Sequence, residues 1–162
     1  MRNLKIAIAR TPILGHAILA IFRAQMALGY FYRPLFNLAE WLFKSKETTN
    51  FTYHLEEHNK RYLASLIADV LNLEFRTVEA YIKEIEDDEE LKRHIADMTA
   101  NSDLAFTADK EVRFGRRIGW YAFARALKPK VIVETGVDKG LGSCVLTAAL
   151  KRNNEEGYEG KY

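Results

Sequence analysis

The chain has 162 residues, of which 48% are hydrophobic and 28% charged, a composition typical of a globular domain and unlike that of a disordered chain. Its one cysteine, Cys144, excludes an internal disulfide and a cysteine-rich zinc site. A single cysteine also fits a reducing compartment, so we expect a cytoplasmic protein, peripheral to a membrane if its N-terminal region binds lipid.

The net charge of +2 is unevenly distributed along the chain. Residues 1–46 contain seven lysines and arginines and one glutamate, a net charge of 7 − 1 = +6, which leaves 2 − 6 = −4 for residues 47–162. The basic, apolar arm of residues 1–46 predicts a surface that binds anions, either lipid headgroups or an acidic partner. Because the rest of the chain is acidic and has no groove-reading motif, we expect no nucleic-acid binding.

The arm is predicted to form two amphipathic helices. Thr11 and Pro12 are typical of a helix start, and the pattern predicts a helix over residues 12–32. The pair Arg33-Pro34 is expected to end it, because the residue before a proline avoids the helical region. A short second helix is then expected over the apolar residues Leu35, Phe36, Leu38, Trp41 and Leu42.

Neither a membrane span nor a cleaved leader is expected in this arm. The uncharged run Thr11–Phe22 is shorter than the about 20 apolar residues that a spanning helix needs. Arg23 and Gln25 interrupt the region that a cleaved leader would keep apolar or small. Two alternatives therefore stay open: both helices lie on a membrane surface, or their apolar faces pack on the rest of the protein.

Residues 47–103 are predicted to be a helical extension, joined to the arm by the polar linker Lys44–Asn50. The clearest helix has apolar residues at helical spacing, namely Leu55, Tyr62, Leu63, Leu66, Ile67, Val70 and Leu71. The next helix has Val78, Tyr81, Ile82 and Ile85 on one face. Asp87 and Glu90 form a capping-box pattern that predicts a third helix, with Leu91, Ile95 and Met98 directed inward. The polar run Asn101–Asp103 ends the helical pattern.

The pattern changes within residues 104–162. A helix with Ile118, Tyr121, Ala122 and Leu127 is expected to end before Lys128-Pro129. The run "VIVET", Val131–Thr135, is β-branched without alternation, which predicts a strand buried on both faces. The sequence "SCVLTAALKR", Ser143–Arg152, then returns to a helical pattern. The predicted unit is therefore strand, glycine-rich turn and helix.

A glycine-rich turn of this kind is suited to binding a ligand. Glycine has no Cβ, so the backbone of Gly136, Gly140 and Gly142 can approach a ligand closely, and the following helix presents free N–H groups. Glu134, at the end of the strand, can accept hydrogen bonds from a ligand amine or hydroxyl. The spacing G-x-x-x-G-x-G differs from the dinucleotide fingerprint, and the nearby carboxylate would repel a pyrophosphate.

The stretch "VIVETGVDKGLGSCVLTAAL", Val131–Leu150, resembles the first motif of class I S-adenosylmethionine-dependent methyltransferases. The stretch "GRRIGWYAFARALKP", Gly115–Pro129, resembles the helix that precedes this motif in some members. The resemblance implies methyl transfer from S-adenosylmethionine to an unknown acceptor, with Glu134 near the methionine portion of the cofactor. The cofactor-binding residues that it implies are Glu134, Thr135, Gly136, Val137, Gly140, Gly142 and Ser143. Asp138 departs from the pattern, because many members have a second glycine there.

The resemblance also implies an α/β fold, the Rossmann-like class I methyltransferase fold, beginning in residues 104–162 after a mostly helical region. The sequence has one convincing strand, with Lys161-Tyr162 as the entrance to a second, so we expect only the first, truncated part of such a domain. A chain of this kind is expected to be largely helical, inactive by itself, and weak in binding S-adenosylmethionine.

Other interpretations concern smaller features. One alternative function is a helical membrane-surface or protein-interaction module without catalysis. A second is a zinc metallohydrolase, because "HLEEH" matches the H-x-x-E-H pattern in which His54 and His58 share a zinc and Glu57 is the base. The simpler interpretation of that pattern is the polar first turn of a helix, and we predict no metal site.

Basic, aromatic and thiol groups also stand near the motif. The basic side chains of Arg113, Arg116 and Arg117 either hold an acidic substrate or the cofactor carboxylate, or lie on the surface with packed stems. The aromatic residues Trp120, Tyr121 and Phe123 either stack on a ligand or belong to the core. A helix N-terminus would lower the pKa of Cys144, but with no histidine nearby in sequence we expect a packing residue there.

Overall fold

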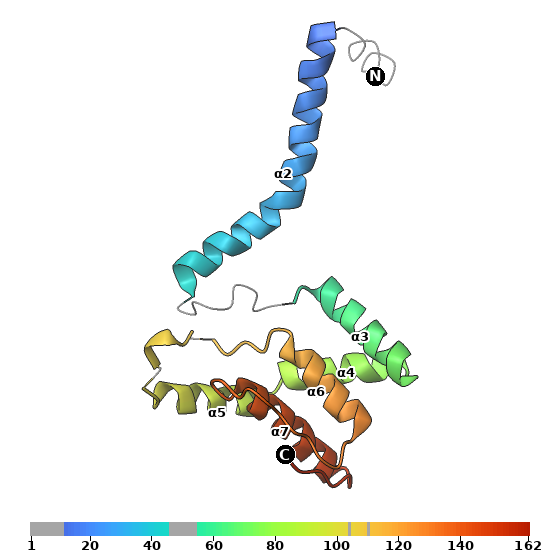
Figure 1. Ribbon diagram of the computed structural model, residues 1–162, viewed down its shortest axis with the longest axis vertical. Helices are drawn as coiled ribbons and strands as arrows, with labels where there is room; N and C mark the ends of the chain where they lie inside the picture. Colours follow the sequence, from blue (N-terminus) through green and yellow to red (C-terminus); the bar gives the residue numbers. More distant parts are fainter. Residues whose placement is uncertain (1–11, 46–54, 104, 110) are drawn as a thin grey trace. The chain divides into compact units, whose positions relative to one another are not determined.

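The computed structural model describes residues 12–45, 55–103, 105–109 and 111–162, and these are almost entirely helical (Figure 1). The helices in chain order are α2 (Pro12–Lys44), α3 (Glu57–Leu71), α4 (Phe75–Glu86), α5 (Glu89–Ala100), η1 (Ala105–Thr107, a 3-10 turn), α6 (Arg117–Leu127) and α7 (Leu141–Glu155). The chain divides into two compact units, residues 1–45 and residues 46–162, which are described separately here. A search of the described helices finds none with the length and apolarity needed to cross a bilayer.

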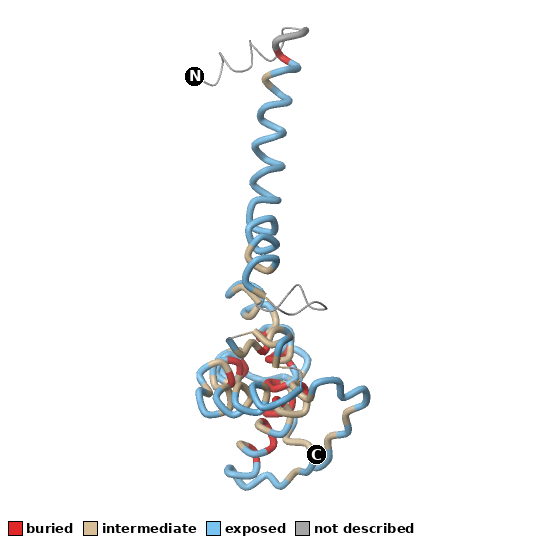
Figure 2. The backbone as a smooth tube through the Cα atoms, turned by 90° about the vertical axis from the view of Figure 1, so that its left-hand side faces the viewer, coloured by how far each residue is buried: buried red, intermediate tan, exposed pale blue. Residues whose placement is uncertain are grey.

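The first unit contains one continuous helix where two were expected. α2 has 33 residues and continues through Arg33 and Pro34, so the predicted break at this pair is wrong. A proline inside a helix removes one backbone hydrogen bond and bends the axis, but the remaining turns can keep their own bonds. Figure 1 shows the bend partway along α2. Most of the helix is exposed, as the pale blue of Figure 2 indicates.

The second unit has its core between α3, α4, α6 and α7. The predicted helices around Ile67, Ile82 and Tyr121 are confirmed, and each of these side chains is buried. α6 approaches α3 closely at Gly119, where an added Cβ would stand 3.3 Å from the Cδ2 of Leu63. The buried apolar residues that make up this core are Ala64, Ile67, Ala68, Val78, Ile82, Ile85, Phe114, Ile118, Tyr121, Ala122, Ala124, Val145 and Ala149.

The start of α5 differs by one residue from the predicted capping box. The N-cap is Asp88, whose Oδ1 accepts a hydrogen bond from the backbone N–H of Leu91 at 2.9 Å, and not Asp87. Asp87 instead ends α4. Leu91 and Ile95 are partly buried against the core, but Met98 is exposed, so its predicted inward direction is wrong.

A buried polar network joins α4, α6 and α7 around Arg125, which is only 2% exposed. Its Nε donates to Oε1 of Glu84 at 2.8 Å, and its terminal nitrogens donate to Asn153 and Glu156. Burial disfavours the charge of Arg125, but the carboxylates of Glu156 and Glu84 outweigh that cost and raise the pKa of Arg125. Burial, with a hydrogen bond to Glu84, also holds the pKa of Tyr121 above its ordinary value. The network therefore fixes α7 against the helices that come before it.

The expected α/β, Rossmann-like fold is wrong for this chain. Across the residues that the structure describes there is no β-sheet, and the strand predicted at Val131–Thr135 is reduced to one parallel bridge between Val131 and Lys161. Two backbone hydrogen bonds hold it, from Ile132 N–H to Lys161 O at 2.9 Å and from Lys161 N–H to Lys130 O at 3.1 Å. Val131 and Val133 are exposed.

The physical reason lies in what surrounds the β-branched run. A strand buried on both faces needs neighbouring strands for its hydrogen bonds and helices above and below it. In the described chain only Lys161 pairs with this run, so Val131 and Val133 stay exposed while Ile132 packs partly against the helical core. The expectation that the chain is largely helical is confirmed.

Candidate functional site

The glycine-rich segment between Val131 and α7 forms an open turn that leads into a helix N-terminus. Gly136 and Gly140 have φ angles of +74° and +81°, a region that side chains rarely adopt, so glycine is needed at both. Gly140 is the N-cap of α7, and no side chain caps its first turn. The backbone N–H groups at this helix start therefore lie beside the turn, as the sequence predicted.

Glu134 is directed back toward α7 from the end of the extended segment. Its Oε2 accepts a hydrogen bond from the hydroxyl of Ser143 at 2.8 Å and another from the hydroxyl of Tyr162. The two hydroxyl oxygens are themselves 2.8 Å apart. The hydrogen bonds from Tyr162 and Ser143 hold the pKa of Glu134 below its ordinary value, and the positive charge of Arg117 adds to this. The carboxylate is therefore ionised and held in one place.

Glycine at position 142 leaves room for neighbouring side chains, whereas its backbone angle is one that other residues can adopt. It is buried, and an added Cβ would overlap Oε1 of Glu134 and stand 3.0 Å from the Cζ3 atom of Trp120. The glycine thus lets the carboxylate, the indole ring and the first turn of α7 come together. The motif residues Glu134, Gly142 and Ser143 are brought into contact by this arrangement.

Arg117 supplies a positive charge to the same site from the start of α6. Its guanidinium lies 5.7 Å from the centroid of the Trp120 ring, and its charge lowers the pKa of Glu134. The Nε of Arg117 is buried and has no hydrogen-bond partner among the residues that the structure describes. Of the predicted basic cluster, Arg113 pairs with Glu111 at 3.1 Å and Arg116 is exposed. Of these three arginines, Arg117 is the one whose charge is found to act on Glu134 within the described residues.

Three of the seven residues implied by the resemblance lie at the open side of the turn. Thr135, Gly136 and Val137 are exposed, and no hydrogen bond from the Thr135 side chain is recorded in this part of the chain. Sequence reasoning missed Tyr162 as a site residue. The available indication was its position after Lys161, because a second parallel segment beside Val131 would bring its next residue close to Glu134.

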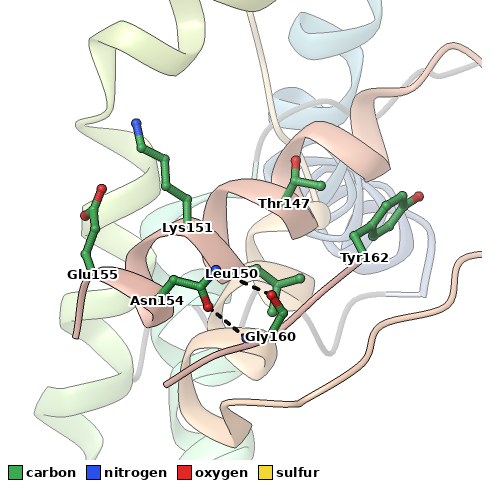
Figure 3. Close-up of a pocket in the computed structure, with 7 residues that line it drawn as sticks. All are labelled: Thr147, Leu150, Lys151, Asn154, Glu155, Gly160 and Tyr162. Carbon is green, nitrogen blue, oxygen red and sulfur yellow. Dashed lines mark hydrogen bonds between the residues drawn. The ribbon is translucent and has the colours of Figure 1, made fainter. Parts of the chain in front are cut away.

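An open groove runs along α7 and not over the glycine turn (Figure 3). Its volume is about 560 Å³, within the size range of ligand pockets. Its lining residues are Thr147, Leu150, Lys151, Asn154, Glu155, Gly160 and Tyr162. Gly160 is fixed at one side by a hydrogen bond from its N–H to Oδ1 of Asn154 at 2.8 Å. Tyr162 belongs both to this groove and to the Glu134 site, so the two are continuous through its ring.

The zinc interpretation gains no support from the described residues. His54 lies outside them, Glu56 is the N-cap of α3, and Glu57 and His58 begin that helix, where Glu57 accepts a hydrogen bond from Lys60 at 2.7 Å. Lys60 lowers the pKa of Glu57 through this hydrogen bond, which makes it a weaker base. A search of the described chain finds no cluster of histidine, cysteine and acidic residues that could hold a metal.

Cys144, the fourth residue of α7, is partly buried, and burial raises the pKa of its thiol. This agrees with the expectation of a packing residue.

No family model, no curated protein and no solved structure matches this chain.

Proposed function

We propose that the Glu134 site binds S-adenosylmethionine and serves a methyltransferase reaction that this chain is not expected to catalyse by itself. The observation that carries the proposal is the ionised carboxylate of Glu134, held by Ser143 and Tyr162 beside a glycine turn and an uncapped helix start. An anionic group at this position disfavours phosphates and favours a cationic ligand. S-adenosylmethionine has two positive groups, the sulfonium and the α-ammonium.

The second charge of the site supports the same ligand. Arg117 is close enough to Glu134 to lower its pKa, and its buried Nε has an unused donor. The methionine end of the cofactor is a zwitterion, whose ammonium complements Glu134 and whose carboxylate complements a guanidinium. Trp120, packed between Arg117 and Gly142, offers an apolar wall to the aliphatic chain that joins these groups. A charge pair of this kind distinguishes the amino-acid end of the cofactor from a free nucleoside.

In the proposed reaction a nucleophile of the acceptor attacks the methyl carbon of the sulfonium. The new bond to carbon forms as the carbon–sulfur bond breaks, and its electron pair returns to sulfur to give S-adenosylhomocysteine. The nucleophile loses its proton to the surrounding water or to a base. The protein contributes mainly by positioning the two reactants, because the sulfonium is already activated.

Binding of the cofactor to this chain is expected to be weak. The turn is exposed at Thr135–Val137, and the extended segment is held by the one bridge to Lys161. A ligand that is only partly enclosed recovers little of the free energy that binding costs. We expect a dissociation constant on the order of 1 mM, equivalent to about −4 kcal/mol.

The test is a nuclear magnetic resonance titration of the 162-residue chain with S-adenosylmethionine, because this method detects weak binding residue by residue. We expect the backbone amides of residues 134–143 to shift, and S-adenosylhomocysteine, which lacks the sulfonium charge, to bind more weakly. Glu134→Gln keeps the hydrogen-bond acceptor but removes the charge, and should weaken binding about tenfold. Glu159→Gln, which removes an exposed carboxylate elsewhere in the same unit, is the matched control.

Three results would contradict the proposal. They are the absence of shifts at millimolar cofactor, shifts confined to residues away from the turn, and equal binding by Glu134→Gln and the unaltered chain.

A further inference from the structure

α2 has an exposed apolar face along nearly its whole length. The large apolar side chains on one side of the helix are 37% to 88% exposed, and they are Ile21, Leu28, Phe31, Tyr32, Leu35, Phe36, Leu38, Leu42 and Phe43. At about 100° per residue these positions span an arc of about 160°, a little under half of the helix circumference. The pale blue of α2 in Figure 2 shows the same exposure along the backbone. An apolar face of this size is unusual unless it has a partner.

The opposite side of α2 carries its basic residues, interspersed with the exposed apolar residues Leu19, Phe22, Met26 and Tyr30. Arg23, Arg33 and Lys44 fall within about a quarter of the circumference, and Asn37 lies among them. The one acidic residue of the helix, Glu40, pairs with Lys44 at 3.0 Å. The helix therefore keeps a net positive charge on the side away from its apolar face.

We propose that α2 lies along the surface of an anionic membrane, with its apolar face in the acyl boundary and its basic side toward the headgroups. A helix with a wide apolar face and lysine or arginine on the other face binds in the plane of the interface. Arg23 and Arg33 stand in the middle of the helix, so a crossing orientation would place both in hydrocarbon. Lying flat leaves both guanidinium groups among the lipid phosphates. The inference does not depend on the proposed cofactor site.

The width and length of the face favour a lipid surface over a protein partner. Two helices that pair along a seam use a narrow stripe, whereas this face spans an arc of about 160° on α2. A helix of 33 residues is about 50 Å long. A domain of about 100 residues has a radius of gyration of about 13 Å, which corresponds to a sphere roughly 34 Å across. A single domain face is therefore too short to cover α2, and a bilayer surface is not.

The experiment is co-sedimentation of the full chain with vesicles of phosphatidylcholine alone and of phosphatidylcholine mixed with phosphatidylserine. We expect binding to the mixed vesicles and little to the neutral ones. Replacing both Arg23 and Arg33 by glutamine should weaken binding to the mixed vesicles by roughly fivefold for each charge. Arg93→Gln, at an exposed position of α5, should leave binding unchanged.

A matched pair of substitutions tests the orientation. Leu28 and Met26 are similarly exposed, at 63% and 68%, but two residues along a helix place them on opposite sides. Leu28 lies at the centre of the apolar face and Met26 lies on the basic side. Leu28→Gln should weaken vesicle binding about tenfold, and Met26→Gln should have a much smaller effect. Circular dichroism of each variant checks that the helices are intact.

Several outcomes would overturn the proposal. Equal losses in Leu28→Gln and Met26→Gln would exclude the orientation, and binding that does not depend on phosphatidylserine would exclude the role of the basic side. If light scattering shows a dimer that Leu28→Gln dissociates, the face binds a second copy. If the full chain does not sediment with either vesicle, the face is covered by protein.

Discussion

A methyl group on Gly142 would occupy the space that the Glu134 carboxylate fills. We therefore expect Gly142→Ala to displace that carboxylate and to abolish detectable S-adenosylmethionine binding, with only a small change in stability, because the displaced atom is the end of a flexible side chain. Urea denaturation measures the stability change and the amide titration measures the binding. Gly29→Ala is the control, because an added Cβ at Gly29 in α2 meets nothing within 4 Å. Normal binding by Gly142→Ala would separate the glycine from the ligand site.

The hydrogen bonds to Glu134 predict an unusual titration. Tyr162 and then Ser143 hold its pKa below the ordinary value, so the ionised form is favoured in the folded chain. Because the folded pKa lies below the unfolded value of about 4.3, this carboxylate stabilises the fold above that pH, and the contribution is lost as the pH falls through the folded pKa.

Carbon-detected nuclear magnetic resonance of the Glu134 side chain gives the midpoint directly. Tyr162→Phe should raise that midpoint, and by more than Ser143→Ala does, because the hydrogen bond from Tyr162 is the larger cause. A midpoint at the ordinary glutamate value in the unaltered chain would show that neither hydroxyl bonds to the carboxylate in solution.

The network around Arg125 predicts a large loss of stability on its removal. Arg125→Met leaves Glu84 and Asn153 without the guanidinium that satisfies them, and removing one partner of a buried ion pair costs about 3–5 kcal/mol. Arg76→Met, at an exposed position of α4, is the matched control and should change stability by less than about 0.5 kcal/mol. Chemical denaturation followed by circular dichroism at the helical band compares the two. Similar midpoints for both variants would mean that the network is not formed.

The one-residue shift at the start of α5 can be tested by two alanine substitutions. Asp88→Ala removes the acceptor for the Leu91 N–H and a carboxylate 3.4 Å from Arg152, so we expect a loss of about 1 kcal/mol or more. Asp87→Ala removes a side chain that does not cap α5 and should cost less. Thermal or urea midpoints distinguish them. A larger effect at Asp87 would restore the capping box that the sequence pattern indicated.

Helix positions were predictable where local pattern decides them. The apolar spacing around Ile67, Ile82 and Tyr121 placed three helices correctly, because each apolar face packs on the same core. The prediction failed at Pro34, since the cost of one missing hydrogen bond is small beside a helix of 33 residues. It also failed at Val131–Thr135, because strand formation depends on partners far along the chain that a local pattern does not contain.

In the candidate site, too, the residues of a local motif were predictable and those from distant segments were not. Glu134, Gly142 and Ser143 were predicted from one contiguous motif, and the structure brings them into contact. Tyr162 donates a hydrogen bond to the same carboxylate, and the charge of Arg117 acts on it. Both residues come from separate segments, so the motif alone could not predict that they lie near Glu134. The buried pairing of Arg125 with Glu84, 41 residues apart, was invisible to sequence reasoning for the same reason.

The position of Pro34 determines which side of α2 loses a backbone hydrogen bond. Pro34 has no N–H to donate to the carbonyl of Tyr30, one turn earlier. At 100° per residue both positions fall on the side of the helix that carries Arg23 and Lys44. In the orientation proposed for α2, the Tyr30 oxygen would therefore face water and not hydrocarbon, so hydration could replace the bond that the ring removes.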